Sequence, residues 1–209
     1  HQSPWDNPDK DFGFISLEAQ VVNLADQIAY NNHDIDDGLS SEIICPTSLE
    51  KEVFLWKEAV HQVRSQYSSL NDETLRSLCI SHIISSQIED VVKNTQNNLK
   101  LKAIETQEDL QSLRTQCVCF SKEMEEKVKV LRDFLYKNFY IHPKVYRMNK
   151  KGQNIIKALF EIIVQDKNLL PIAYQNRLKK DTNIFRVAAD YISGMTDPYA
   201  AKLYNNLFN

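Results

Sequence analysis

The sequence contains few of the residues that make tight turns, with only 4 Gly and 6 Pro among its 209 residues. A β-sheet fold with many hairpins uses more of both, so this scarcity argues against such a fold and leaves room for long helices. The sequence also lacks any apolar run near the roughly 20 residues that a membrane-spanning helix needs. We therefore expect a cytoplasmic protein with no membrane partner.

A strong charge of one sign is missing as well, because 25 Lys and Arg stand against 28 Asp and Glu, a formal net charge of −3. This balance gives no strong electrostatic signal for nucleic-acid binding. The C-x-x-C spacing typical of zinc sites is also absent. Reduced, mostly buried thiols are therefore a better interpretation than a zinc site for the four cysteines, Cys45, Cys79, Cys117 and Cys119.

Apolar residues recur at helical spacing in five separate segments, which predicts an all-α fold with more than half of the residues in helices. These segments are 17–38, 49–67, 72–97, 121–139 and 153–166. A short helix after Pro171 and two more near the C-terminus complete the pattern, the first of the two capped by Asp181 or Thr182. Because no internal repeat or boundary is evident, residues 1–209 are predicted to form a single helical unit.

The first predicted helix, Leu17 to Gly38, has two different faces. Ser16 suits its N-cap, and Gly38 suits its C-terminal end. One face carries apolar residues for packing, namely Leu17, Val21, Leu24, Ile28 and Ile35. The other face, which we call the acidic stripe, carries Asp26, Tyr30, His33, Asp34 and Asp37.

An acidic stripe of this kind is often only a solvated helix face. Two details favour a binding site instead. Apolar residues extend toward the acidic edge at Val22, Ala25 and Ala29, so we expect much of the helix circumference to be buried. Tyr30 also lies inside the stripe, where Lys or Gln would be more usual. A row of buried carboxylates would indicate a metal or substrate site.

Three segments resemble, in the same order, motifs of one enzyme family. They are ADQIAYNNHDIDDGL at Ala25–Leu39, NFYIHPKVYRM at Asn138–Met148 and RVAADYISGMTDPYA at Arg186–Ala200. They are similar to the last motif, an internal segment and the C-terminal signature of the deoxyguanosinetriphosphate triphosphohydrolase family of HD-domain phosphohydrolases. The resemblance implies an all-α, HD-domain-like bundle and the hydrolysis of a deoxynucleoside triphosphate to a deoxynucleoside and triphosphate.

The resemblance also implies a role for each matching residue. Asp26 matches the final ligand of a divalent metal, for which Mg²⁺ or Mn²⁺ is expected, and Tyr30 and Asp34 match contacts to the sugar 3′-hydroxyl. The family's first His and its His-Asp pair are not matched, because the adjacent His33 and Asp34 lie inside the final-Asp motif. No catalytic acid or base is identified, and Pro198 replaces the Arg that usually follows the Asp of the family's MTD motif.

We therefore expect the C-terminal part of a longer enzyme, in which the N-terminal helices with the first metal ligands are missing. Residues 1–40 would hold the last HD motif, and residues 41–209 a helical C-terminal region. The metal site would be incomplete, and the chain alone inactive. The expected partners are a deoxynucleoside triphosphate, the missing N-terminal part and, because family members often assemble, further copies of the same protein.

Further candidates for the site are less sharply defined. His33 lies at the edge of the acidic stripe and suits a cap or surface role equally well. Lys144 and Arg147 belong to a basic, aromatic-rich segment, residues 140–151, that suits a phosphate contact as well as a solvated loop.

Near the C-terminus, Arg186 and Tyr191 are candidates for structural support or for a nucleotide contact. Arg186 should pair with Asp190 because the two residues are four positions apart on a helix. Two other function classes remain open for the whole chain: a catalytically inactive helical scaffold, and a helical regulatory subunit that senses nucleotides without hydrolysing them.

Overall fold

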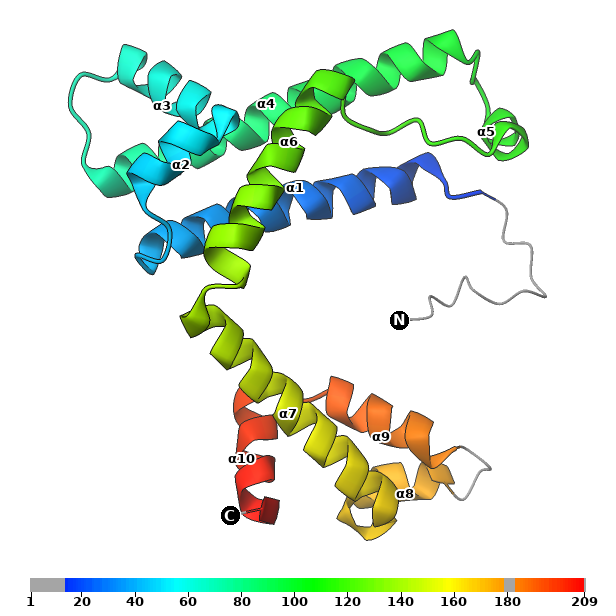
Figure 1. Ribbon diagram of the computed structural model, residues 1–209. Coiled ribbons are helices and arrows are strands. Elements are labelled where there is room, and N and C mark those ends of the chain that lie inside the picture. The colour runs from blue at the N-terminus through cyan, green and yellow to red at the C-terminus, as the bar shows by residue number, and fades with distance from the viewer. Residues whose placement is uncertain (1–13, 179–182, 209) are drawn as a thin grey trace. The chain divides into compact units, whose positions relative to one another are not determined.

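The computed structural model describes residues 14–178 and 183–208, and every regular element in these ranges is helical (Figure 1). The all-α prediction is therefore confirmed. The chain divides into two compact units, one ending at Ile141 and the other beginning at His142. The division of the chain at residue 40 into a last HD motif and a C-terminal region stays a prediction.

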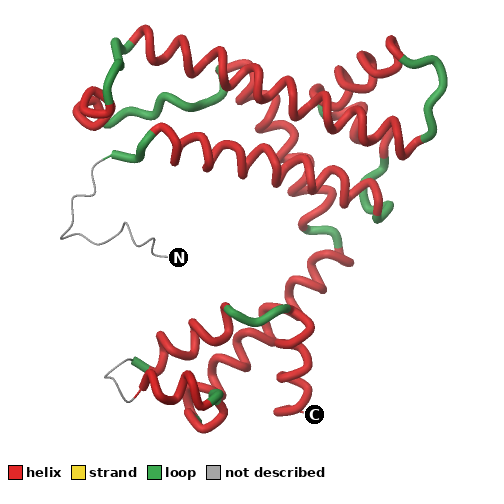
Figure 2. The backbone as a smooth tube through the Cα atoms, turned by 180° about the vertical axis from the view of Figure 1, so that it is seen from behind, coloured by secondary structure: helices red, strands yellow, loops and turns green. Residues whose placement is uncertain are grey.

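Unit 1 is built around two long helices, α1 (Leu17–Ser40) and α4 (Asp72–Leu101), which pack against each other (Figures 1 and 2). Helix α6 (Lys122–Leu135) crosses α1, and α3 (Phe54–Gln66) packs against both α4 and α6. The other elements of unit 1 are α2 (Pro46–Glu52), α3 (Phe54–Gln66), α5 (Gln107–Leu113), α6 (Lys122–Leu135) and the π-helical turn η1 (Tyr136–Tyr140).

Helix α1 begins as predicted, because the Ser16 hydroxyl accepts a hydrogen bond from the Ala19 amide at 3.3 Å. It ends later than predicted and includes Gly38, so the role of Gly38 as the C-terminal stop is wrong. A Cβ atom added at Gly38 would lie only 2.3 Å from Ile44 Cδ1. Glycine is needed here because the chain after α1 folds back and packs directly on the helix.

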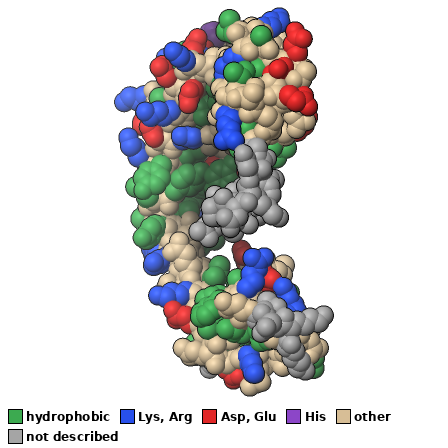
Figure 3. All heavy atoms as spheres, turned by 90° about the vertical axis from the view of Figure 1, so that its right-hand side faces the viewer, with side chains coloured by type: hydrophobic (Ala, Val, Ile, Leu, Met, Phe, Trp, Pro, Cys, Tyr) green, Lys and Arg blue, Asp and Glu red, His purple; other side chains and the backbone are tan. Residues whose placement is uncertain are grey.

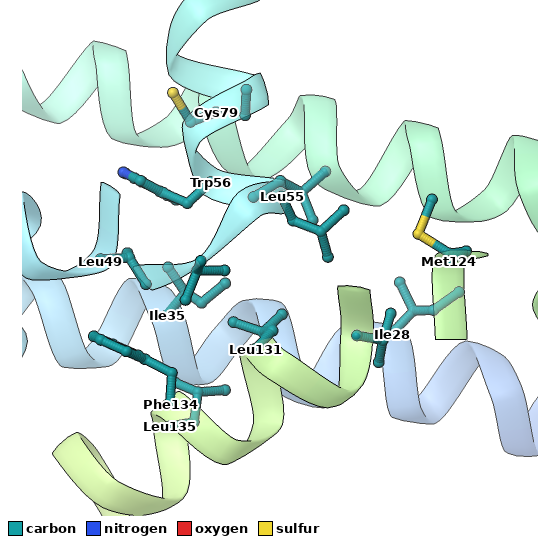
Figure 4. Close-up of a cluster of buried hydrophobic side chains, with 14 of the residues drawn as sticks. Ile28, Ile35, Leu49, Leu55, Trp56, Cys79, Met124, Leu131, Phe134 and Leu135 are labelled. Atoms are coloured by element: carbon teal, nitrogen blue, oxygen red, sulfur yellow. The ribbon is translucent and has the colours of Figure 1, made fainter. Parts of the chain in front are cut away.

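The core of unit 1 lies where α1, α2, α3, α4 and α6 meet (Figure 4). Its fully buried or nearly fully buried side chains include Ile35, Leu49, Leu55, Trp56, Leu131 and Leu135. Burying each such side chain stabilises the fold by about 1.5–3 kcal/mol. The packing face predicted for α1 is therefore largely confirmed. The prediction is wrong for Val21, since half of its surface is exposed.

A buried amide pair lies between the two long helices. Asn32 Nδ2 of α1 donates to Gln87 Oε1 of α4 at 3.1 Å, and both side chains are almost completely buried. Asn32 Oδ1 and Gln87 Nε2 have no hydrogen-bond partner among the described residues. A buried amide pair with two unpartnered atoms stabilises the fold less than well-packed apolar side chains would. Its contribution is therefore to fix the alignment of α1 with α4.

Two further predictions about the helices of unit 1 are wrong. The segment 49–67 forms two helices because Val53 adopts an extended conformation, with φ −111° and ψ 107°, between α2 and α3. This break lets Leu49 and Val53 both reach the core, where each is about fully buried. Helix α4 also continues to Leu101, beyond its predicted end at residue 97.

Unit 2 contains a long helix, α7 (Pro143–Gln165), and shorter elements that pack on it. Helix α7 begins ten residues before its predicted start at residue 153, because Pro143 suits a first helical position. The shorter elements are η2 (Lys167–Leu169), α8 (Ile172–Leu178), α9 (Ile184–Ser193) and α10 (Asp197–Phe208). The buried core of unit 2 is made by Ile163, Leu170, Val187, Ala188 and Tyr191.

Helix α9 is capped at both ends. Asp181 and Thr182, the predicted caps, lie outside the described residues, and the Asn183 side chain caps α9 by accepting a hydrogen bond from the Phe185 amide. Gly194 is the C-cap of α9.

Candidate functional site

The acidic stripe of α1 is mostly exposed, and Asp34 is its one buried member. Asp34 is 9% exposed, whereas Asp26, Tyr30, His33 and Asp37 are all exposed. The expectation of a buried carboxylate row is therefore wrong for every member except Asp34. The reason is geometric, because Asp34 lies at the side of the stripe that borders the buried face of α1.

The apolar flank of the stripe is exposed as well. Val22, Ala25 and Ala29 were expected to be buried, but no helix in the described part of unit 1 covers them. Helical periodicity finds the apolar residues correctly, yet it cannot tell which apolar face has a partner within the chain.

The buried Asp34 carboxylate has a hydrogen-bond partner from the last residues of unit 1 in the sequence. The hydroxyl of Tyr140, the last residue of η1, donates a hydrogen bond to Asp34 Oδ2. Burial raises the pKa of the Asp34 carboxyl, and the neighbouring charge of Asp37 raises this pKa further, although the Tyr140 hydrogen bond opposes the shift. Burial and the nearby Asp34 carboxylate raise the pKa of Tyr140, so Tyr140 remains a hydrogen-bond donor.

Tyr30 completes a small group that we call the Tyr-Asp cluster, made of Tyr30, Asp34 and Tyr140. The rings of Tyr30 and Tyr140 are 6.5 Å apart between centroids and tilted by 43°, within the range of favourable aromatic pairs. Tyr30 is 59% exposed, so its hydroxyl can reach a ligand. The structure thus brings two predicted substrate contacts, Tyr30 and Asp34, to one small surface.

The sequence analysis did not identify Tyr140 as a site residue. The available signal was its position in the segment Asn138–Met148, which carries part of the family resemblance. Tyr140 also ends a π-helical turn, a feature that occurs often at functional sites but has no clear sequence pattern.

Asp26 has an exposed carboxylate on α1. Within residues 14–178 and 183–208, no group of three or more His, Cys, Asp or Glu side chains could hold a metal ion. Since Mg²⁺ and Mn²⁺ need several oxygen or nitrogen ligands, the described residues do not fit a complete metal site. The role of Asp26 as a metal ligand stays a prediction.

An apolar groove runs along the opposite edge of the stripe, between α1 and α4. Its volume is about 640 Å³, and its lining includes Ala25, Ala29, His33, Ile84, Ile88 and Val92. Ile88 and Val92 are each 49% exposed. Hydrophobic side chains are visible on the surface of unit 1 (Figure 3). Exposed apolar surfaces of this kind occur at protein–protein contacts and at ligand-binding grooves.

The less sharply defined site candidates His33, Lys144 and Arg147 lie on the surface of the protein. His33 is exposed and lines the apolar groove, and its role in a site stays a prediction. Lys144 and Arg147 are exposed on α7, and Arg147 Nε donates to the Pro143 carbonyl at 3.0 Å.

Arg186 and Tyr191 take part in contacts that stabilise unit 2. The predicted pair is confirmed, with Arg186 Nε 2.9 Å from Asp190, and Arg177 binds the other carboxylate oxygen. These two arginines, Arg177 first, lower the pKa of Asp190. Tyr191 is buried with its hydroxyl 3.1 Å from that of Tyr199, and burial raises the pKa of Tyr191 to about 12. These contacts favour the structural interpretation of both candidates.

Comparison with protein families defines the class of the chain. Residues 118–206 match the model of the phosphohydrolase-associated domain. The chain is thus an all-helical protein that carries a phosphohydrolase-associated domain. None of the helices in the described part of the chain has both the length and the apolar character that crossing a membrane requires.

Individual relatives show more closely which phosphohydrolases the chain is similar to. The deoxyguanosinetriphosphate triphosphohydrolase-like protein of Geobacter sulfurreducens is 39% identical over 215 residues, which cover 100% of this chain and 55% of that relative. Proteins of the same description from Ralstonia pickettii and Leptospira interrogans are 39% and 34% identical, over 92% of this chain and 49% and 51% of their own lengths.

The family resemblance seen in the three sequence motifs is therefore confirmed. The chain is a homologue of the deoxyguanosinetriphosphate triphosphohydrolase-like proteins over its whole length, and it spans about half the length of the curated relatives it matches.

Proposed function

We propose that this chain forms part of a metal-dependent enzyme that hydrolyses a deoxynucleoside triphosphate to a deoxynucleoside and triphosphate. The main support is the Tyr-Asp cluster, in which a buried carboxylate is held by Tyr140 beside the exposed hydroxyl of Tyr30. The names of the relatives support the same substrate class for this chain.

The Tyr-Asp cluster has the chemistry to hold a sugar hydroxyl. Asp34 Oδ2 accepts a hydrogen bond from the Tyr140 hydroxyl, whereas Oδ1 accepts none among the described residues. A sugar hydroxyl can donate to Asp34 Oδ1 and accept from the Tyr30 hydroxyl at the same time. Because Tyr140 fixes the carboxylate before the ligand arrives, little freedom is lost on binding.

Asp26 would supply one ligand for a divalent metal, Mg²⁺ or Mn²⁺, with the other ligands coming from residues outside this chain. When bound, such a metal supplies an activated water and neutralises phosphate charge. The apolar groove supports this arrangement, since a further helix of a longer protein could cover it as well as the exposed Ala25 and Ala29. Assembly into a homo-oligomer and a cytoplasmic location belong to the same proposal.

Triphosphate release from deoxynucleoside triphosphates, measured with Mg²⁺ and with Mn²⁺, tests the proposal. The 209-residue chain alone should be inactive, whereas the full-length protein that contains it should turn over. Asp26→Asn should abolish both turnover and metal binding in that protein, and Asp37→Asn, an exposed carboxylate on the same stripe, should alter neither.

The two other function classes give different results in this experiment. A full-length protein that binds nucleotide without hydrolysing it would be a nucleotide sensor. One that neither binds nor hydrolyses would be a scaffold.

A further inference from the structure

The segment that connects α5 to α6 contains two cysteines separated by a single residue, Cys117 and Cys119. The proposed hydrolysis uses neither of them. Both thiols are free, and Cys117 is completely buried whereas Cys119 is half-buried. A reversible protein disulfide needs an accessible thiol that reacts first and a neighbouring thiol that resolves the product. The C-x-C motif, by which we mean residues 117–119, supplies one of each.

The backbone keeps the two cysteines within the range of a disulfide. Residues two positions apart are separated by at most about 7 Å between Cα atoms, and disulfides join Cα atoms about 4.4–6.8 Å apart. The chain bends at Val118, so the motif is not fully extended. Cys119 Sγ donates a hydrogen bond to the Cys117 carbonyl at 3.9 Å, which directs this thiol back toward Cys117.

Two side-chain amides of α4 hold the motif from one side. Asn94 Nδ2 and Asn98 Nδ2 each donate to Cys119 Sγ at 3.4 Å. The same amide of Asn98 donates to the Cys117 carbonyl at 2.9 Å, and that of Asn94 donates to the Cys119 carbonyl at 3.0 Å. Because sulfur is a weak acceptor, the carbonyl contacts hold the backbone while the sulfur remains available for a covalent bond.

One buried side chain of α1 holds the motif from the other side. Gln20, which is 4% exposed, accepts hydrogen bonds from the backbone amides of Cys117 and Val118 at 2.9 and 3.1 Å. Hydrogen bonds from both long helices of unit 1 therefore meet on these three residues. A covalent change within the motif would act on its contacts with α1 and with α4.

The other two cysteines lie in different surroundings. Cys79 is completely buried, and burial raises its pKa to about 11, so this thiol stays protonated near neutral pH. Cys45 is exposed, and a hydrogen bond with the Thr47 hydroxyl lowers its pKa to about 7. Cys45 should therefore react readily with small disulfides, and it must be replaced before the C-x-C motif can be followed alone.

We propose that Cys117 and Cys119 form a reversible disulfide when the protein meets a small disulfide such as glutathione disulfide, and that this bond loosens the motif from α1. The Cys119 thiolate attacks one sulfur of glutathione disulfide, which releases one glutathione thiolate and leaves a mixed disulfide on Cys119. The Cys117 thiolate then attacks Cys119 Sγ and releases the second glutathione. The two protein thiols are oxidised and lose their protons, while one glutathione disulfide is reduced to two glutathione thiols.

The new bond changes the conformation of the motif. Cys119 Sγ must turn away from the amides of Asn94 and Asn98 to reach Cys117, and the small ring changes the backbone torsions at Val118. The Cys117 and Val118 amides then no longer point together at Gln20. The inference does not rest on the proposed hydrolysis, because Asp26 and the Tyr-Asp cluster take no part in it.

Thiol–disulfide exchange in the 209-residue chain carrying Cys45→Ser tests the proposal. The folded chain is incubated with graded ratios of glutathione disulfide to glutathione, quenched with acid and digested with trypsin. Both cysteines lie between Arg114 and Lys122, so they stay in one peptide, residues 115–122. The expected peptide is two hydrogens lighter than the reduced one, and dithiothreitol restores its mass. A peptide that stays reduced, or that retains one glutathione, would overturn the proposal.

Single substitutions separate the two thiols. Cys117→Ser should stop at the mixed disulfide, because Cys119 can still attack but nothing resolves the product. Cys119→Ser should leave the buried Cys117 reduced over the same time. Circular dichroism verifies that both variants are folded. If Cys117 takes up glutathione in Cys119→Ser as fast as Cys119 does in Cys117→Ser, the assigned order of attack is wrong.

Hydrogen exchange measured by NMR tests the effect on the fold. The amides of Cys117 and Val118 should exchange about tenfold faster in the oxidised chain, because each loses its hydrogen bond to Gln20. The amide of Val63 is the control, since this residue lies in the core of unit 1 on α3 and should exchange at the same rate in both forms. Equal exchange of the Cys117 and Val118 amides before and after oxidation would overturn the loosening.

Discussion

Asp34 accepts a hydrogen bond from Tyr140, a residue 106 positions further along the chain. This single contact connects α1, which carries the acidic stripe, to the π-helical turn at the end of α6. It also explains how a carboxylate that is 9% exposed can be kept in a helix next to the core of unit 1.

The first prediction concerns the hydroxyl of Tyr140. Tyr140→Phe leaves the buried Asp34 carboxylate without its donor, so the free energy of unfolding should fall by about 1–3 kcal/mol. Urea denaturation of the 209-residue chain measures this loss. Tyr136→Phe is the control, because Tyr136 lies in the same π-helical turn but is 60% exposed. Equal effects of the two substitutions would show that the hydrogen bond contributes nothing to stability.

The second prediction concerns pH. Because burial raises the pKa of Asp34 in the folded chain, the carboxyl favours folding below its unfolded pKa of about 3.9, and this contribution is lost as the pH rises through the raised value. Asp34→Asn does not titrate. Its unfolding free energy, relative to the parent, should therefore increase between about pH 4 and pH 7. Denaturation of both proteins across this range checks the sign, and a decrease would mean that the Tyr140 hydrogen bond outweighs burial.

The third prediction concerns the close approach of Gly38 and Ile44. A methyl group at Gly38 would overlap Ile44, and overpacking costs about 1–3 kcal/mol. The higher helix propensity of Ala offsets up to about 1 kcal/mol, so Gly38→Ala should still destabilise unit 1.

Two companion variants test this explanation by chemical denaturation. Ile44→Val removes the nearest atom, so the double variant should lose less stability than the sum of the single changes. Gly152→Ala in α7 is the control, because a Cβ there meets no atom within 4 Å, and it should stabilise by about 0.5–1 kcal/mol. Strict additivity in the double variant would rule out the steric explanation.

The fourth prediction concerns substrate binding in the full-length protein. Tyr30→Phe should raise KM through the loss of one neutral hydrogen bond, worth about 0.5–1.5 kcal/mol. A 3′-deoxy substrate lacks the same contact, so its KM should be nearly unchanged by Tyr30→Phe. If the substitution weakens both substrates equally, Tyr30 does not meet the 3′-hydroxyl.

Local features of the fold could be predicted from the sequence because their causes are local. Ser16 caps α1 as expected, with its hydroxyl accepting a hydrogen bond from the Ala19 amide three residues ahead. The Arg186–Asp190 pair follows from spacing alone. The break at Val53 was missed because it is set by packing in the core, which outweighs helix propensity.

The candidate site was predictable only in part. Helical spacing placed Tyr30 and Asp34 on one face, but only the folded chain shows that Tyr140 joins them, since no local pattern encodes a contact across 106 positions. The exposed Val22 and Ala29 could not be distinguished from core residues, because periodicity records an apolar face and not its partner.

The buried amide pair Asn32–Gln87 has a consequence for redesign of this protein. Replacing both residues with Leu would remove two unpartnered polar atoms and should make unfolding harder. It would also remove the one buried side-chain hydrogen bond between α1 and α4 among the described residues, leaving apolar contacts and the partly exposed Arg76–Asp36 ion pair, which holds the register only weakly. Helix α1 could then slide along α4 by one turn, about 5.4 Å, and carry Asp34 out of reach of Tyr140. A more stable variant would thus be a less accurately aligned one.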